Sequence, residues 1–150
     1  MIIEGKKVAY ITLGCKLNFS ETSTIKHSLE NAGTQTVGEK EGADIFVINT
    51  CSVTDVAEKK GRQLIRKIIH RNPGAYIIVV GCYAQLRAKE LLEIEGVNLV
   101  LGAGDKFKVE DYLRHAEGIS QIEIRKFEYI TGVGFVLLLG FGVAQVIFYL

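Results

Sequence analysis

The stretch ADIFVINTCSVTDVAEKKGRQLIRKIIHRNPGAYIIVVGC, from Ala43 to Cys82, decides the fold. It starts and ends with short apolar runs, Ala43–Asn49 and Ala75–Gly81, of the kind expected for strands buried on both faces of a sheet. Between them, Thr54–Arg71 has apolar residues at helical spacing and is ended by the NPG turn. A strand, a helix and a second strand in this order predict a parallel βαβ unit.

The same alternation continues on both sides of this unit. A strand is predicted at Lys7–Leu13 and a helix at Asn18–Ala32, and a further helix, strand and helix follow at Ala84–Ile94, Val97–Leu101 and Lys106–Ala116. Strands that alternate with helices at this spacing are typical of a doubly wound α/β domain with a mostly parallel sheet. At 150 residues, the chain is long enough for one such domain.

The net charge, the first residues and the number of cysteines indicate where the protein is located and what its cysteines can do. A net charge of +1 carries no general nucleic-acid signature. The first residues, MIIEGKKVAYITL, lack the basic start, long apolar segment and small-residue cleavage site of a secretory signal, so we expect a cytoplasmic location. In a reducing cytoplasm, the three cysteines suggest metal ligands, a catalytic thiol or core residues rather than disulfides.

All three cysteines directly follow predicted strands. Cys15 lies in TLGCKLN, Cys51 in INTCSVT and Cys82 in VVGCYAQ. In a doubly wound sheet, ligands bind outside the carboxyl ends of the strands, so we expect the three thiols at one edge of the sheet. Convergent thiolates suit a soft-metal site, either zinc with one outside ligand or an iron–sulfur cluster.

The residues alone leave the identity of this site open. Structural zinc sites usually have close cysteine pairs such as C-x-x-C, and the sequence has none. A [4Fe–4S] cluster held by three cysteines leaves one iron without a protein ligand, open to a substrate or a sulfur species. Free cysteines are also common in protein cores, although three equivalent positions weaken that alternative.

Three motifs carry a resemblance to a known family. TLGCKLN, ADIFVINTCSVTDVAEKKGRQLIRK and VVGCYAQ resemble the N-terminal domain of the radical S-adenosylmethionine tRNA methylthiotransferases, over about Lys6–Ala116. The residues around the cysteines are most similar to the branch that acts on N6-threonylcarbamoyladenosine. The resemblance implies a flavodoxin-like α/β domain from residue 6 to residue 116.

The resemblance also implies a cofactor and a reaction. Cys15, Cys51 and Cys82 would bind an auxiliary [4Fe–4S] cluster that supplies or carries sulfur. In the full-length enzyme, a second cluster in a following barrel cleaves S-adenosylmethionine, and a methylthio group is added to C2 of the adenosine beside the tRNA anticodon. No catalytic side chain is assigned in this chain. Three side chains near the cysteines would donate hydrogen bonds to the cluster sulfurs or else cap loops, namely Asn18, Asn49 and Gln85.

The sequence departs from this family after the third cysteine. No cysteine follows Cys82, so the C-x-x-x-C-x-x-C motif for the second cluster is missing, and we expect the chain to be a fragment that is inactive alone. Residues 117–128 are predicted to form a linker. The uncharged tail YITGVGFVLLLGFGVAQVIFYL, residues 129–150, is interpreted as a truncation or frameshift product, with a membrane segment or extra strands as alternatives.

A second function stays open at this point. The chain could be a flavodoxin-like binding module with a three-cysteine zinc site or no metal, anchored to a membrane by residues 129–150. Membrane contact is the less favoured interpretation, because no Lys or Arg follows the apolar segment. The identity of the metal and the partitioning into membranes distinguish this alternative from tRNA modification.

Overall fold

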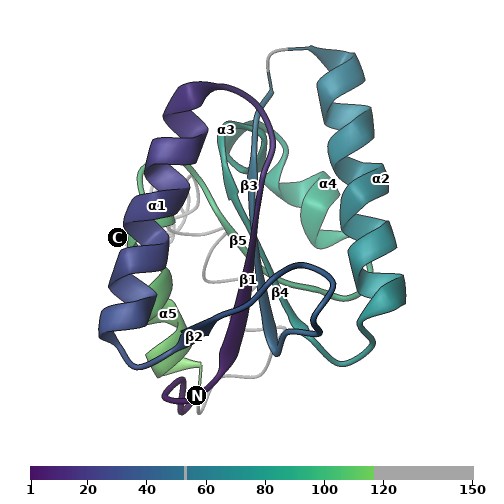
Figure 1. Cartoon of the computed structure of the whole chain (residues 1–150). Coiled ribbons are helices and arrows are strands. Elements are labelled where there is room, and N and C mark those ends of the chain that lie inside the picture. Colours follow the sequence, from purple (N-terminus) through teal and green to yellow (C-terminus); the bar gives the residue numbers. More distant parts are fainter. Residues whose placement is uncertain (53, 117–150) are drawn as a thin grey trace, which may run out of the picture.

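The chain forms a parallel sheet with helices on both faces (Figure 1). The computed structural model describes residues 1–52 and 54–116, so the predicted linker 117–128 and tail 129–150 lie outside the described residues. The strands are β1 (Lys7–Thr12), β2 (Gln35–Thr36), β3 (Ile45–Thr50), β4 (Tyr76–Gly81) and β5 (Val97–Leu101). The helices are α1 (Lys16–Asn31), α2 (Asp55–Arg71), α3 (Cys82–Leu86), α4 (Ala88–Leu92) and α5 (Val109–His115), with a 3-10 turn, η1 (Lys106–Lys108), before α5.

The strand order in the described part of the chain is β2-β1-β3-β4-β5, and every neighbouring pair is parallel. This is the order of flavodoxin-like, doubly wound sheets. The predicted fold class is therefore confirmed. In such a sheet the order of winding reverses between β1 and β3, and ligands bind near the carboxyl ends of the strands at that point.

The central strand β3 supplies apolar side chains to both faces of the sheet. Successive side chains of a strand point to opposite faces, so Phe46 packs with α2, α3 and α4, whereas Val47 packs with α1 and α5. Both side chains are fully buried. Figure 1 shows the same arrangement, with α1 and α5 on one side of the sheet and α2 and α4 on the other. Burial on both faces explains the continuous apolar run in the sequence.

The largest difference from the predicted elements lies after β4. The helix predicted at Ala84–Ile94 is two short helices, α3 and α4, separated at Arg87, whose φ of −129° and ψ of 35° lie outside the helical region. The break allows Tyr83 of α3 and Leu91 of α4 both to pack, fully buried, in the same core. Among the described residues, no helix is both long enough and apolar enough to cross a bilayer.

The close approach of β4 to β3 at their carboxyl ends requires a glycine. Gly81 has a φ of 106° and a ψ of −162°, a backbone region that residues with side chains rarely adopt. A Cβ atom at this position would lie 2.5 Å from the Asn49 Oδ1 atom and would also overlap the carbonyl oxygen of Thr50. Gly81 therefore brings the ends of the two strands together directly before Cys82.

We predict that Gly81→Ala lowers the free energy of unfolding by about 4 kcal/mol, because backbone strain adds to the steric overlap with β3. Gly74→Ala is the matched control, since Gly74 also has a positive φ, 87°, but no atom lies within 4 Å of the added Cβ. The control should lose only about 1–2 kcal/mol. Urea unfolding followed by circular dichroism measures both values, and equal losses would contradict the steric argument.

A buried ion pair links α1 to the segment that follows β5. The Lys106 Nζ atom lies 2.6 Å from the Glu21 Oε1 atom, and the two side chains are only 7% and 14% exposed. Charged groups removed from water to this degree are costly unless they are paired. The pair therefore holds the start of η1 against α1.

Lys106→Met is predicted to lower the free energy of unfolding by about 3–5 kcal/mol, because it leaves the Glu21 carboxylate buried without its partner. The double variant Lys106→Met/Glu21→Leu should recover most of this loss. Lys108→Met is the control, since its ion pair with Asp105 is largely exposed and should contribute about 1 kcal/mol or less. Chemical unfolding tests the set, and a double variant as unstable as the single one would refute the explanation.

Candidate metal centre at the carboxyl edge of the sheet

The three cysteines lie where three neighbouring strands end. Cys15 is the N-cap residue of α1, just after β1, and Cys51 directly follows β3. Cys82 directly follows β4 and is the first residue of α3. The register pairs Thr12 with Asn49, and the last residues of β3 and β4 with each other. The thiols therefore share the side of the sheet at which β1, β3, β4 and β5 end, here called the carboxyl edge.

None of the three thiols is a core residue. All three cysteines are free, Cys15 and Cys82 are exposed, and Cys51 is half-buried. The alternative that they are ordinary buried cysteines is therefore wrong. Exposed thiols at the ends of neighbouring strands are available to an added ligand, which is the property that a metal site needs.

A second glycine brings the first cysteine segment against the second. Gly14 has a φ of 114°, and a Cβ atom added there would lie 2.6 Å from the Cβ atom and 3.2 Å from the Sγ atom of Cys51. The backbone next to Cys15 therefore lies directly on the Cys51 side chain. The absence of a side chain at Gly14 makes this contact possible, because any Cβ would collide with Cys51.

Two of the three side chains that were predicted to donate to the cluster sulfurs, Asn18 and Asn49, instead hold the backbone around Cys15. Asn18 is buried, and its Nδ2 donates a hydrogen bond to the Leu13 carbonyl over 2.7 Å, while its Oδ1 lies 3.6 Å from the Cys15 Sγ and can accept from the thiol. Asn49 is also buried, and its Nδ2 donates to the Asn18 carbonyl and to the Thr22 hydroxyl over 3.0 and 3.2 Å. These contacts fix the start of α1 on β1 and β3.

Gln85, the third predicted neighbour, is engaged elsewhere. Its Oε1 accepts a hydrogen bond from the backbone N–H of Ala103 over 3.1 Å and lies against Gly102, so the side chain caps the segment after β5. Of the three side chains, only Asn18 has a hydrogen bond to a cysteine among the described contacts. Asn18 and Asn49 thus support the cysteine segments, whereas Gln85 supports the neighbouring turn.

A polar network between α2 and α3 is a feature that the sequence analysis did not anticipate. The Ser52 hydroxyl donates a hydrogen bond to Glu58 Oε1, and the Arg87 Nε lies 3.7 Å from Glu58 Oε2. Nearby, the Arg62 Nη1 donates to the Tyr83 hydroxyl over 2.6 Å, and this hydrogen bond raises the pKa of Arg62 above its ordinary value. Two of these residues directly follow cysteines in the sequence. That adjacency is the one signal that could have identified them.

Most of the exposed apolar side chains lie on the same edge of the sheet as the cysteines. Five of the six large apolar residues that are exposed in the described part of the chain lie on segments that follow β1, β3, β4 or β5 at this edge, namely Leu17, Phe19, Val56, Leu86 and Phe107. The sixth, Ile2, lies near the N-terminus. Exposed apolar residues gathered at one place indicate a surface that contacts another molecule or another part of a protein.

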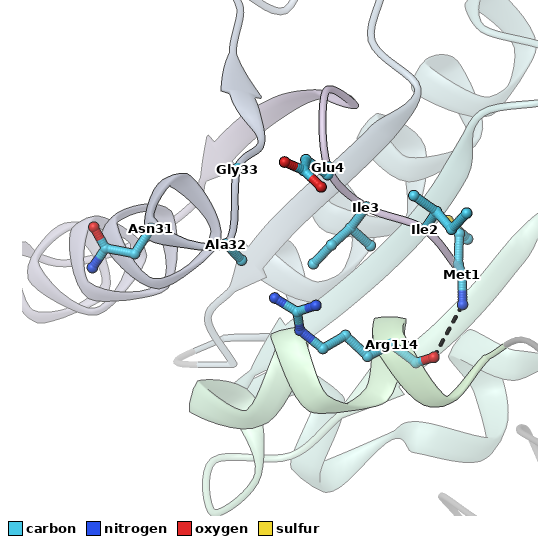
Figure 2. A pocket seen from close by; sticks show the side chains of 8 residues that line it. All are labelled: Met1, Ile2, Ile3, Glu4, Asn31, Ala32, Gly33 and Arg114. Atoms are coloured by element: carbon cyan, nitrogen blue, oxygen red, sulfur yellow. Dashed lines mark hydrogen bonds between the residues drawn. The ribbon is translucent and has the colours of Figure 1, made fainter.

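A pocket of about 460 Å³ lies at the opposite edge of the sheet. It is lined by Met1–Glu4, by the end of α1 at Asn31–Gly33, and by Arg114 of α5 (Figure 2). The Met1 amino group donates hydrogen bonds to the carbonyl oxygens of Leu113 and Arg114 over 3.0 and 3.1 Å and so closes one side. This pocket contains no cysteine. The candidate metal centre lies at the other edge, where Cys15 and Cys82 are exposed.

The three cysteines form a donor set of the soft type that zinc and iron–sulfur clusters both take. Among residues 1–52 and 54–116, no three His, Cys, Asp or Glu side chains lie close enough together to hold one metal ion. A zinc ion draws its ligands to within about 2.3 Å of one centre, whereas the cysteines of a [4Fe–4S] cluster bind separate irons and stand farther apart. Cys15, Cys51 and Cys82 supply three thiols at neighbouring strand ends.

Comparison with known proteins identifies relatives over this same region. Residues 7–102 match the family described as "Uncharacterized protein family UPF0004". The chain is 44% identical over 106 residues to the threonylcarbamoyladenosine tRNA methylthiotransferase MtaB of Bacillus subtilis (strain 168). The aligned residues are 71% of this chain and 24% of that protein. The chain is 36% identical over 141 residues to the protein of the same name from Aquifex aeolicus (strain VF5), covering 85% of this chain and 34% of the relative.

A relative with a different name is more distant. The tRNA-2-methylthio-N(6)-dimethylallyladenosine synthase of Fervidobacterium nodosum is 32% identical over 111 residues, which cover 74% of this chain and 25% of that protein. The chain thus spans about a quarter to a third of the length of these curated relatives. The resemblance to the tRNA methylthiotransferases that the sequence motifs indicate is confirmed. Because the match over residues 7–102 includes all three cysteines and all five described strands, this chain belongs to the protein family UPF0004.

Proposed function

We propose that this chain is the cluster-binding N-terminal domain of a tRNA methylthiotransferase that modifies N6-threonylcarbamoyladenosine beside the anticodon. The observation that carries the proposal is the convergence of Cys15, Cys51 and Cys82, all unburied, at the carboxyl ends of three neighbouring strands. The names of the relatives support the reaction. The higher identity to the threonylcarbamoyladenosine enzymes than to the dimethylallyladenosine enzyme supports the choice of substrate.

The three cysteines would hold a [4Fe–4S] cluster at the carboxyl edge. When bound, such a cluster supplies an iron without a protein ligand, at which sulfur can be carried. The chain's own residues contribute its support: the amides of Asn18 and Asn49 hold the backbone around Cys15 on the sheet, and Gly14 keeps the first segment against Cys51. The apolar side chains around the edge suit coverage by the rest of a longer enzyme, which would exclude water from the sulfur.

The remaining parts of the proposal concern the whole enzyme. S-adenosylmethionine and tRNA would bind to the longer protein, in the reducing cytoplasm where thiolate ligands persist. We assign residues 6–116 to the cluster domain, 117–128 to a linker and 129–150 to an apolar tail that is a truncation or frameshift product or a membrane segment. Three cysteines that hold zinc, or no metal, in a membrane-anchored module are the alternative that the following measurement separates.

The reconstituted chain is predicted to contain about four irons with matching sulfide. Cys15→Ala, Cys51→Ala and Cys82→Ala should each lose most of this iron, because each removes one of the three protein ligands. Ser20→Ala, an exposed residue of the same edge, is the control and should retain it. Anaerobic iron and sulfide analysis with visible absorption measures the content. Zinc in place of iron, or iron that is indifferent to the cysteines, would overturn the proposal in favour of the binding module.

The 150-residue chain is predicted not to methylthiolate tRNA by itself, because no cysteine follows Cys82 to hold a second cluster. The assay combines the reconstituted chain with tRNA, S-adenosylmethionine and a reductant, and modified nucleosides are quantified by mass spectrometry. The methylthiotransferase MtaB of Bacillus subtilis, assayed in parallel, is the positive control. Product formed by the short chain would show that the second cluster is not needed.

A further inference from the structure

One carboxylate connects the segments of two cysteines that are 31 residues apart in the sequence. Glu58 lies in the first turn of α2 and is only 9% exposed. One of its oxygens accepts from the hydroxyl of Ser52, the residue after Cys51. Its other oxygen faces Arg87, at 3.7 Å, which follows the short helix α3 that starts at Cys82. The carboxylate thus contacts both cysteine segments from a third element.

Glu58 needs both partners because it is buried. A carboxylate removed from water is unfavourable unless hydrogen bonds and an opposite charge replace its hydration. Ser52 supplies the hydrogen bond and Arg87 the charge. Both partners are therefore drawn toward one point, and the loop after β3 and the end of α3 lose freedom to move apart.

A second contact keeps α3 against α2 at the same place. Tyr83, the residue after Cys82, is fully buried, and its hydroxyl accepts a hydrogen bond from Arg62 of α2. Gly61 of α2 lies next to its ring, since a Cβ at this position would be in ordinary van der Waals contact with the ring at 3.8 Å. α2 is therefore held to the segment after Cys82 by the Arg62 hydrogen bond as well as by Glu58.

We propose that Glu58 is a positioning residue for the metal centre: by holding Ser52 and Arg87, it fixes the distance between the thiols of Cys51 and Cys82. The importance of Glu58 for a cluster rests on the proposed function. Its effect on the distance between the two thiols does not. The register of β3 and β4 aligns the two strand ends. The loop that carries Cys51 and the helix that carries Cys82 begin where the pairing of the two strands ends. Glu58 holds these two segments in place there.

The first test uses the metal-free chain in a Cys15→Ala background, so that only two thiols remain. A bifunctional alkylating reagent, dibromobimane, bridges Cys51 and Cys82, and the bridged product is followed by mass spectrometry. Adding Glu58→Gln or Ser52→Ala should slow bridging about fivefold, the equivalent of one ordinary hydrogen bond. The rate of modification by a monofunctional reagent, measured in parallel, corrects for altered reactivity of the single thiols.

Asp55→Asn is the matched control. Asp55 lies on the same turn of α2 and carries the same charge, but it is exposed, so its variant should bridge at the parental rate. Ser52→Ala removes only a half-buried hydroxyl, so it keeps the test decisive if Glu58→Gln proves too unstable to study. Bridging at the parental rate in a folded Glu58→Gln or Ser52→Ala chain would overturn the inference.

The second test loads the full chain with all three cysteines present. Glu58→Gln is expected to release iron to a chelator about tenfold faster than the parent, as is typical when a residue that orients metal ligands is changed, while Asp55→Asn is unchanged. Iron released at the parental rate would overturn the role of Glu58 at the metal. A parent chain that takes up no iron would refute the proposed function alone, because the bridging result would still stand.

Discussion

Parallel pairing of β1, β3 and β4 is the constraint on which the rest of the structure depends. Parallel strands all end on the same side of a sheet, and the register sets Thr12 beside Asn49 and Thr50 beside Gly81. Residues that follow these strands therefore emerge side by side, however far apart they lie in the chain. The carboxyl edge, with its three cysteines, is a consequence of this geometry and needs no local cysteine motif.

Strand pairing brings the cysteine segments together, and a small number of close contacts then hold them. Glycines at the ends of β1 and β4 allow backbone to approach side chains and carbonyls at distances that any Cβ would prevent. The buried amides of Asn18 and Asn49 join α1 to the sheet. Among the described residues, the buried Asn49 Oδ1 has no hydrogen-bond partner, an unusual feature in a protein interior, and it faces Gly81 beside the site.

The two edges of the sheet differ in chemistry. The carboxyl edge presents thiols and exposed apolar side chains. The opposite edge has a pocket closed in part by the amino terminus, which is hydrogen-bonded to the end of α5. Apolar surface in water is unfavourable, so the exposed apolar side chains at the carboxyl edge indicate a surface that contacts another molecule or another part of a protein. At the opposite edge, Ile2 is the one large apolar residue exposed in the described part of the chain.

Much of the fold could be predicted from local patterns. The apolar runs located β1, β3, β4 and β5 to within two residues, and the helical spacing located α1 and α2. The strand β2 was not predicted, because it has only two residues, both exposed, and so carries no apolar pattern. The break at Arg87 was missed for a different reason: it depends on how Tyr83 and Leu91 fit one core, not on any helix-ending residue.

The sequence by itself determined the order of strands and helices and, through it, the shared edge of the three cysteines, because apolar periodicity is a local property of the chain and parallel strands end on one side. Only the tertiary structure decided which side chains support that edge. Glu58 meets Ser52 six residues before it and Arg87 twenty-nine residues after it. Such a meeting follows from how α2 packs against α3, and packing depends on three-dimensional shapes that no spacing in the sequence records.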